Sequence, residues 1–461
     1  MLIWKTQTLN ANVASLRYRC LLPLKYLANK GMPQSIYGGA EPVELTDKTD
    51  TIVFVKSFQD RDVETCKRAA ELGMSIILDL CDNIFIQDYA ADSDHIPADN
   101  FRLMAQHAKA IVATGEALKA EIKKAIAPLN VPITVIPDGC ETQLDLADAL
   151  RITRRRWIGN SAGKIASKRL PAIFNRLQKV KKRARNLWVR LKIRIKQNMG
   201  NLEAEPALEH NLSTSLKATA QIDQTHLPNQ ATPSVKKSDK SLVQPTPIFP
   251  QRWPKAKPGT QTILWFGNHG AKYGSFGMSS ILQVAPAIEQ LSREQPLRLV
   301  VVSNSQAKYE RYIQPLPFET LYLRWHPQKT YDYIRNSDVA IIPNSQSIYS
   351  ICKSANRAVL ALSQGTPVVA SSTPALDPFK DCLILDDWEL GLRQYLLNPK
   401  IARSHVAAAQ RVIARNFSGE KIAQQWLALI KAIDNADISQ DCSQLGNAVE
   451  AIAHLNNKDQ I

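Results

Sequence analysis

The sequence lacks long apolar runs, a secretory leader and closely spaced cysteines. No apolar stretch approaches the roughly 18 residues that cross a bilayer, and the N-terminus MLIWKTQTLN has no basic leader before an apolar run. We therefore expect neither a membrane-spanning helix nor a signal peptide. With 44% hydrophobic and 22% charged residues among 461, wholesale disorder and fibrous repeats are also excluded.

Cysteine is scarce, and its spacing excludes the common cysteine motifs. The chain has seven cysteines, and no pair has the spacing of a zinc or thioredoxin-like motif. This pattern predicts a reduced cytoplasmic protein without a metal site, whose thiols are mostly inert. The cysteines are Cys20, Cys66, Cys81, Cys140, Cys352, Cys382 and Cys442.

Acidic residues are missing from one segment only. Residues 151–200 contain 17 Lys or Arg and no Asp or Glu, while the whole chain carries a net charge of +16. The remaining residues are therefore almost neutral. The protein is predicted to be a neutral globule with one concentrated basic segment.

Short β-rich runs alternate with helical runs in two parts of the chain. Residues 1–150 and 261–435 each read as a parallel α/β sheet of the doubly wound type. We expect a ligand site between two such domains, beyond the carboxyl ends of their strands. The expected strands are 2–4, 51–55, 75–79, 110–113 and 133–136 in the first part, and 262–266, 297–302, 320–323, 339–342, 367–370 and 382–385 in the second.

The residues between the two domains differ in composition. Residues 201–260 are rich in Pro, Gln, Ser, Thr and Lys, which predicts a flexible linker, and residues 436–461 read as a polar tail. Within 170–196, apolar residues including Phe174 and Trp188 recur at helical spacing opposite Lys and Arg. Such an amphipathic basic helix suits an anionic membrane surface. A solvated helix and a nucleic-acid site are the alternatives, the latter the weakest because no nucleic-acid fold surrounds it.

The stretch Lys353-Ser-Ala-Asn-Arg carries the most specific chemistry. We expect a helix to begin near Lys353, so that Lys353 and Arg357 are one turn apart and Asn356 lies in the same turn. Cations and amides at a helix N-terminus suit a diphosphate. A solvated basic helix start is the alternative interpretation.

Two carboxylates follow an expected strand of the first domain. Asp79 and Asp82 lie where a second substrate would enter, and carboxylates there can orient or deprotonate a hydroxyl group. Capping of the next helix and bonding to loop amides explain the same residues equally well.

These motifs together resemble a known family. The order strand, loop, helix, Gly365-x-Pro-Val-Val is similar to the donor-binding domain of GT-B glycosyltransferases, in particular the retaining group 1, family 4-like enzymes that use nucleotide sugars. Gly267-Asn268-His269-Gly270 looks like the family's glycine turn, and Val135-Ile-Pro-Asp-Gly like its hinge-side element. The resemblance covers residues 1–145 and 260–432. It implies two Rossmann-like domains facing across a cleft, and the long basic, partly disordered insert expected between them lies outside the resemblance.

The resemblance also implies site residues. Gly267, Asn268, Lys272, Lys353, Asn356 and Arg357 would hold the donor and its phosphates, with Asp79 and Asp82 as catalytic carboxylates and Arg17 and Arg19 reaching across the cleft or towards the acceptor. The nucleotide sugar would be a co-substrate, with no other cofactor and no metal. Where the family has two glutamates, this chain has Cys352 and Leu360.

The sequence therefore predicts a glycosyltransferase (EC 2.4) that moves a sugar from a nucleotide sugar to a glycan or lipid-linked acceptor. We expect retention of configuration, polysaccharide biosynthesis as its setting, and a cytoplasmic, peripheral location at the inner face of the membrane through residues 165–200. Two alternatives stay open: an inactive glycosyltransferase-like binding or scaffold protein, and another GT-B enzyme such as a nucleotide-sugar epimerase.

Overall fold

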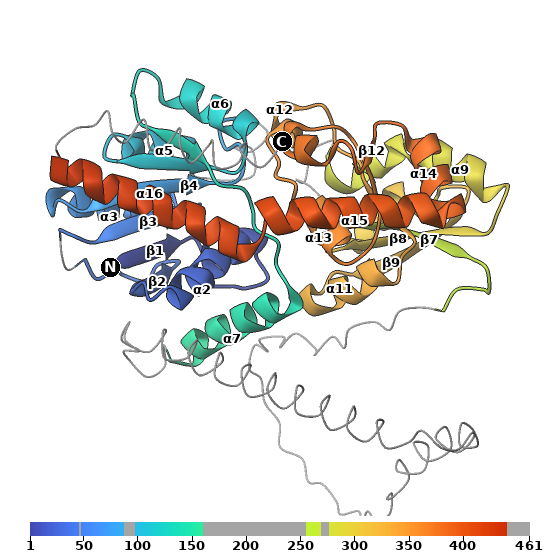
Figure 1. Cartoon of the computed structure of the whole chain (residues 1–461), viewed down its shortest axis with the longest axis horizontal. Helices are drawn as coiled ribbons and strands as arrows, with labels where there is room; N and C mark the ends of the chain where they lie inside the picture. Colours follow the sequence, from blue (N-terminus) through green and yellow to red (C-terminus); the bar gives the residue numbers. More distant parts are fainter. Residues whose placement is uncertain (46–47, 87–96, 160–254, 269–275, 440–461) are drawn as a thin grey trace, which may run out of the picture. The chain divides into compact units, whose positions relative to one another are not determined.

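The protein is described here by a computed structural model covering residues 1–45, 48–86, 97–159, 255–268 and 276–439 (Figure 1). Residues of both expected domains are gathered into one compact unit. Most of the basic segment 151–200, the linker 201–260 and the tail 436–461 lie outside the described residues, including the amphipathic stretch 165–200.

The N-terminal domain contains a six-stranded parallel sheet in the order β2-β1-β3-β4-β5-β6. The five expected strands are confirmed, and a sixth, β2, was not predicted because its sequence QSIYG has no continuous apolar run. The strands are β1 (Leu2–Thr6), β2 (Gln34–Gly38), β3 (Thr51–Val55), β4 (Ser75–Leu80), β5 (Ala110–Ala113) and β6 (Ile133–Val135). The helices are α1 (Ala14–Leu16), the π-helix η1 (Arg17–Leu21), α2 (Leu22–Asn29), α3 (Asp60–Glu71), α5 (Pro97–Ala105), α6 (Glu116–Ile126) and α7 (Gln143–Gly159).

The C-terminal domain repeats the architecture with the order β12-β11-β10-β7-β8-β9. Its six expected strands are confirmed as β7 (Gln261–Phe266), β8 (Leu297–Ser303), β9 (Glu319–Arg324), β10 (Val339–Ile342), β11 (Val368–Ala370) and β12 (Ile384–Leu385). The helices are η3 (Gly277–Gln283), α9 (Ala285–Ser292), α10 (Gln306–Tyr312), α11 (Pro327–Arg335), α12 (Ile348–Ile351), α13 (Asn356–Ser363), η4 (Pro374–Phe379), α14 (Trp388–Leu397) and α15 (Pro399–Asn416).

The central strands of the C-terminal sheet are mainly apolar because both of its faces are covered. Along β7, Ile263 and Trp265 belong to one hydrophobic core cluster, and Leu264 and Phe266 to the other. Successive side chains of a strand point to opposite faces. An uninterrupted apolar run is therefore what a sheet with two cores requires.

The order of the C-terminal strands reverses between β7 and β10. From β7 the chain proceeds outward to β8 and β9, and it then returns to the other side of β7 to form β10. At such a switch point the two connections leave in opposite directions, which opens a crevice beyond the strand ends. Gly267 follows β7 and Pro343-Asn344 follow β10, so these residues border the crevice position.

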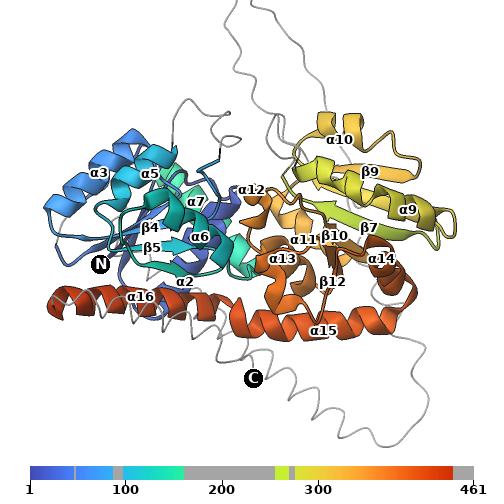
Figure 2. The ribbon, with the colours of Figure 1, turned by 90° about the horizontal axis from the view of Figure 1, so that it is seen from above.

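The last described helix, α16 (Gly419–Ser439), packs on the N-terminal domain, although its sequence position continues the C-terminal domain. It contacts α2, and Trp426 meets Trp4 of β1 edge to face at 5.2 Å between ring centroids (Figures 1 and 2). Just before α16, the carbonyl of Phe417 accepts a hydrogen bond of 2.6 Å from the amide of Cys140. After α15 the chain thus returns from the C-terminal domain to the N-terminal domain.

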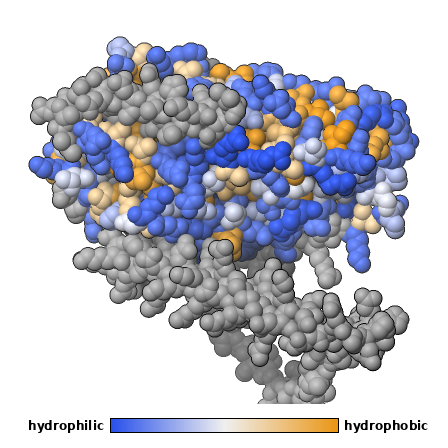
Figure 3. Space-filling view, in the orientation of Figure 1, coloured by the Kyte–Doolittle hydropathy of each residue, from blue (hydrophilic) through white to orange (hydrophobic). Residues whose placement is uncertain are grey.

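The surface seen in Figure 3 is mainly hydrophilic, with smaller hydrophobic groups between. Scattered exposed apolar residues are normal for a folded domain. Among the helices of the described residues, none is both long enough and apolar enough to cross a membrane.

Candidate anion site at the contact between the domains

The segment Lys353-Ser354-Ala355-Asn356-Arg357 lies at the contact between the domains. Short helix α12 ends at Ile351, and α13 begins at Asn356 rather than near Lys353, so the expected helix start is wrong by three residues. Lys353 and Ser354 therefore lie in the turn before α13. The backbone of this turn lets the segment contact both domains.

Lys353 pairs with Asp82 of the N-terminal domain. Its ammonium binds Asp82 Oδ1 and donates to the hydroxyl of Tyr349 at 2.8 Å, and it lies 4.0 Å from the centre of the Tyr349 ring. The other Asp82 oxygen binds Lys56, which follows β3. Burial alone would raise the pKa of Asp82, but the two lysines hold it well below its ordinary value. Asp82 is therefore an ionised carboxylate shared by two cations.

The next residues of the segment bind a second carboxylate, Asp138. Ser354 Oγ donates to Asp138 Oδ2 at 2.6 Å, and the Asn356 amide donates to the same oxygen at 3.4 Å. Arg19 approaches the other Asp138 oxygen at 3.4 Å from within the N-terminal domain. Asn356, which the sequence predicted to bind the sugar donor, thus contacts the opposite domain in this structure.

Arg19 and Asp79 form a buried pair inside the N-terminal domain. Arg19 is 1% exposed and Asp79 0%, and the Arg19 Nε lies 3.1 Å from Asp79 Oδ2. Arg19 also donates to the carbonyl of Ile136 at 2.7 Å. Of the two carboxylates that the sequence singled out, only Asp82 reaches the contact between the domains.

Arg17 likewise stays within its own domain. Its Nε donates to Glu141 at 2.8 Å, and Tyr331 of the C-terminal domain donates to the same carboxylate at 3.0 Å. The contact across the domains is made by Tyr331, which the sequence reasoning missed together with Lys56, Asp138 and Glu141. The acidic residues of the hinge-side element, Asp138 and Glu141, were the available signal.

Arg357 has a different environment from Lys353. It lies on the first turn of α13, and its Nη2 donates to Asn344 Oδ1 at 2.9 Å, beside the switch point of the C-terminal sheet. A Cβ placed on Gly267 would lie 3.3 Å from Arg357 Nη1. Among the described residues no carboxylate lies within ion-pair distance of Arg357, and burial lowers its pKa to about 10.

The two positions where the family has glutamates hold packing residues. Cys352 is buried and belongs to the hydrophobic core of the N-terminal domain, and its sulfur lies 3.8 Å from the amide of Asn83. Leu360 is buried in the core of the C-terminal domain. Neither side chain points to a ligand role in this arrangement.

Other expected site residues are less informative. Asn268 is exposed after β7, while Lys272 lies outside the described residues. Within the described part of the chain, no group of three or more His, Cys, Asp or Glu side chains is arranged to hold a metal ion.

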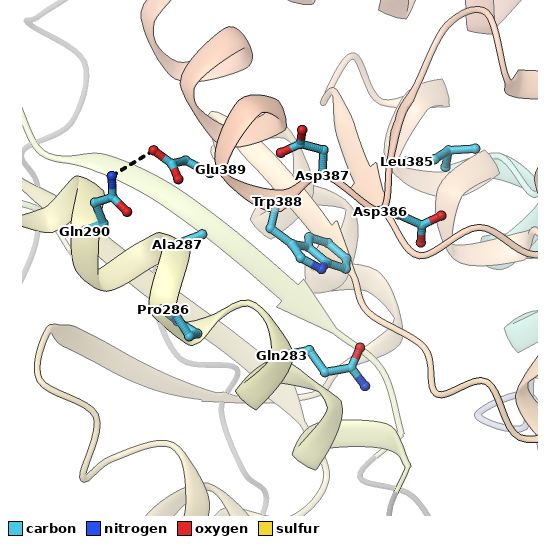
Figure 4. A pocket seen from close by; sticks show the side chains of 9 residues that line it. All are labelled: Gln283, Pro286, Ala287, Gln290, Leu385, Asp386, Asp387, Trp388 and Glu389. Carbon is cyan, nitrogen blue, oxygen red and sulfur yellow. Dashed lines mark hydrogen bonds between the residues drawn. The ribbon is translucent and has the colours of Figure 1, made fainter.

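A separate pocket of about 540 Å³ lies on the C-terminal domain, between α9 and the start of α14 (Figure 4). Three carboxylates line it, those of Asp386, Asp387 and Glu389, and no Lys or Arg does. This charge opposes an anionic ligand. The contact between the domains, which carries Lys353, is therefore a better candidate for a phosphate site than this pocket.

Comparisons with known proteins agree on the architecture. No family model and no curated protein matches the sequence. The solved sucrose-phosphate synthase of Thermosynechococcus elongatus is similar, with a TM-score of 0.50 and 11% identity over 95% of this chain and 100% of that one. An α,α-trehalose 6-phosphate synthase of Burkholderia multivorans has a TM-score of 0.46 and 10% identity over 92% of this chain and 77% of that one. Together with its two parallel sheets, the first similarity shows that this chain has the two-Rossmann-domain GT-B fold.

Proposed function

We propose that the protein is a glycosyltransferase whose C-terminal domain binds a nucleotide sugar through its diphosphate. One observation carries the proposal: Arg357 is a guanidinium beside the switch point of the sheet, with a neutral hydrogen-bond partner and no carboxylate at ion-pair distance among the described residues. Leaving a partly buried cation without a counter-charge costs free energy. An anionic ligand would remove that cost.

The surrounding residues fit a diphosphate. Gly267 leaves room beside Arg357, and a backbone without a side chain lets a phosphate approach. Asn268, Lys272, Lys353 and Asn356 would complete the donor site. Lys353, in the turn before α13, would be the second cation for the second phosphate group.

The chemistry follows from charge. When the bond to the sugar breaks, negative charge grows on the leaving diphosphate, and cations fixed beside it stabilise the transition state. We propose that Arg357 and Lys353 supply this stabilisation, with retention of configuration and without a metal ion.

Asp82 has the wrong pKa for a general base. Because Lys56 and Lys353 hold its pKa low, it accepts a proton poorly at neutral pH. We assign it the orientation of cations and of an acceptor hydroxyl group. Asp79, sealed against Arg19, supports this region from within the domain.

The acceptor side of the proposal comes from the sequence. The 17 Lys or Arg of residues 151–200 would suit an anionic membrane surface. We propose that the acceptor is a glycan or lipid-linked molecule at the cytoplasmic side of that surface. Binding of a fusion of residues 165–200 to anionic liposomes tests this part, and a fusion that ignores such liposomes contradicts it.

The donor part is tested by titrating UDP, GDP and ADP into the full chain and into Arg357→Gln. We expect one of these nucleotides to bind, and the variant to lose that binding. Arg311→Gln on α10, an exposed arginine, is the control. Sugar-nucleotide turnover, with product analysis, then decides the reaction, since an epimerase would convert the free nucleotide sugar without an acceptor.

A second candidate function rests on Cys352 and Leu360. The protein has no acidic group at either position, and both side chains are buried in the cores. A binding or scaffold protein without catalysis accounts for this. Nucleotide binding without turnover would favour it.

A further inference from the structure

We infer that Asp82 determines which anions the site accepts: it competes with the ligand for Lys353, and so it weakens the binding of ligands with two phosphate groups, which need both cations, more than that of ligands with one, which need only Arg357. This inference rests on the proposed function, since it concerns the same site. It adds a specificity-determining residue that the sequence interpretation treated only as a catalytic carboxylate.

The contacts of Asp82 account for its role. Oδ1 binds Lys353 of the C-terminal domain, and Oδ2 binds Lys56 of the N-terminal domain. Each oxygen therefore has its own cation. If Lys353 leaves, Asp82 keeps Lys56 and is not left as an uncompensated charge in a mostly buried position.

Lys353 also keeps a contact when a ligand anion takes the place of Asp82 beside it. The hydroxyl of Tyr349 lies 2.8 Å from the ammonium, and the ring lies 4.0 Å from it. Tyr349 is itself packed against Phe276, with ring centroids 4.7 Å apart. Lys353 thus keeps the Tyr349 hydroxyl and ring as contacts when it exchanges one anion for another.

Lys353 and Arg357 therefore differ in how available they are to an anionic ligand. Arg357 has the neutral partner Asn344, whereas Lys353 is neutralised by Asp82. An anion with a single phosphate group gains Arg357 without any exchange. A second phosphate group is needed to compete with Asp82 for Lys353, and it then adds a strong charge-assisted contact.

The test is a double-mutant cycle on the full chain, with pyrophosphate and inorganic phosphate as probes in calorimetric titrations. The proteins are wild type, Asp82→Asn, Lys353→Met and the double variant. We expect Asp82→Asn to raise the affinity for pyrophosphate about tenfold, within the usual range of coupling between sites. The gain for phosphate should be smaller, and the gain for pyrophosphate should vanish when Lys353 is absent.

Controls separate this effect from net charge and from misfolding. Asp99→Asn makes the same charge change at an exposed side chain of α5 and should leave both affinities unchanged. Circular dichroism and the thermal midpoint report folding, and Asp82→Ser serves as a second variant if Asp82→Asn does not fold.

Several outcomes overturn the inference. It is wrong if Asp82→Asn leaves pyrophosphate affinity unchanged or lowers it, if the gain persists without Lys353, or if phosphate gains as much as pyrophosphate. If Arg357→Gln does not affect pyrophosphate binding while the cycle behaves as expected, the proposed function loses its support and the inference stands. If no variant binds pyrophosphate, both are wrong.

Discussion

The two domains have similar parallel sheets but contribute different charged groups where they meet. The N-terminal domain contributes the carboxylates of Asp82, Asp138 and Glu141, and the C-terminal domain contributes Lys353 and Arg357. Most of these charges are satisfied within the protein. Arg357 differs, since its described partner is the neutral amide of Asn344.

This difference indicates what each arginine or lysine does. A cation that faces a buried carboxylate contributes to the structure, and its loss leaves an uncompensated charge. A cation without such a partner contributes little to stability and is available to a ligand. Arg19 and Arg357 represent the two cases, and only the substitution at Arg19 should lower stability strongly.

The largest effect is expected for Arg19→Met. The substitution leaves Asp79 buried without its cation, so we expect a loss of about 3–5 kcal/mol in the free energy of unfolding. Urea denaturation measures this loss. Arg102→Met, at a half-buried arginine of α5 whose ion-pair partner Asp99 is exposed, should cost less than about 1 kcal/mol. Equal losses for both variants would contradict the assignment of Arg19 to the structure.

The comparison becomes sharper with Arg357→Met. Because no carboxylate at ion-pair distance depends on Arg357, we expect an unchanged or slightly raised thermal midpoint. Affinity for the bound nucleoside diphosphate should fall roughly tenfold to a hundredfold, as for the loss of a charged hydrogen bond of about 1.5–3 kcal/mol. A destabilised variant with intact binding would reverse the roles of the two arginines.

A smaller effect is expected for Gly267→Ala. The added Cβ would lie 3.3 Å from Arg357 Nη1, so the guanidinium must move by a few tenths of an ångström. We expect a reduction of nucleotide affinity by a few-fold, measured by the same titration. Gly259→Ala tests a glycine away from the site, and it should affect stability rather than binding because its φ is +82°.

The smallest effect concerns pH. The folded state lowers the pKa of Asp82, so its ion pairs stabilise the fold fully above the ordinary carboxyl pKa of about 3.9. This contribution is lost as the pH falls below that value. We therefore expect the difference in stability between wild type and Asp82→Asn to be constant from pH 7 to 5 and to narrow below pH 4. A difference that already narrows near pH 6 would show that Asp82 is not held ionised by the lysines.

Much of the architecture could be predicted from local patterns. Eleven strands were expected, and the structure contains these and β2 in two six-stranded sheets. Buried parallel strands are apolar on both faces, so they are visible as continuous runs. Strand β2 was not predicted because Gln34 stands where an apolar residue would be expected. Its amide oxygen accepts a hydrogen bond of 2.8 Å from the indole of Trp4, which lies 30 residues away in the chain.

The sequence by itself determined the two sheets and the basic segment, and it singled out Lys353, Asn356 and Arg357, because periodicity, composition and residue type are local properties. Only the tertiary structure decided which of these groups are already neutralised. Lys353 and Arg357 are four residues apart and both cationic, yet one meets a carboxylate 271 residues away and the other meets an amide. Ion pairing depends on distance in space, and a pattern along the chain contains no such distance.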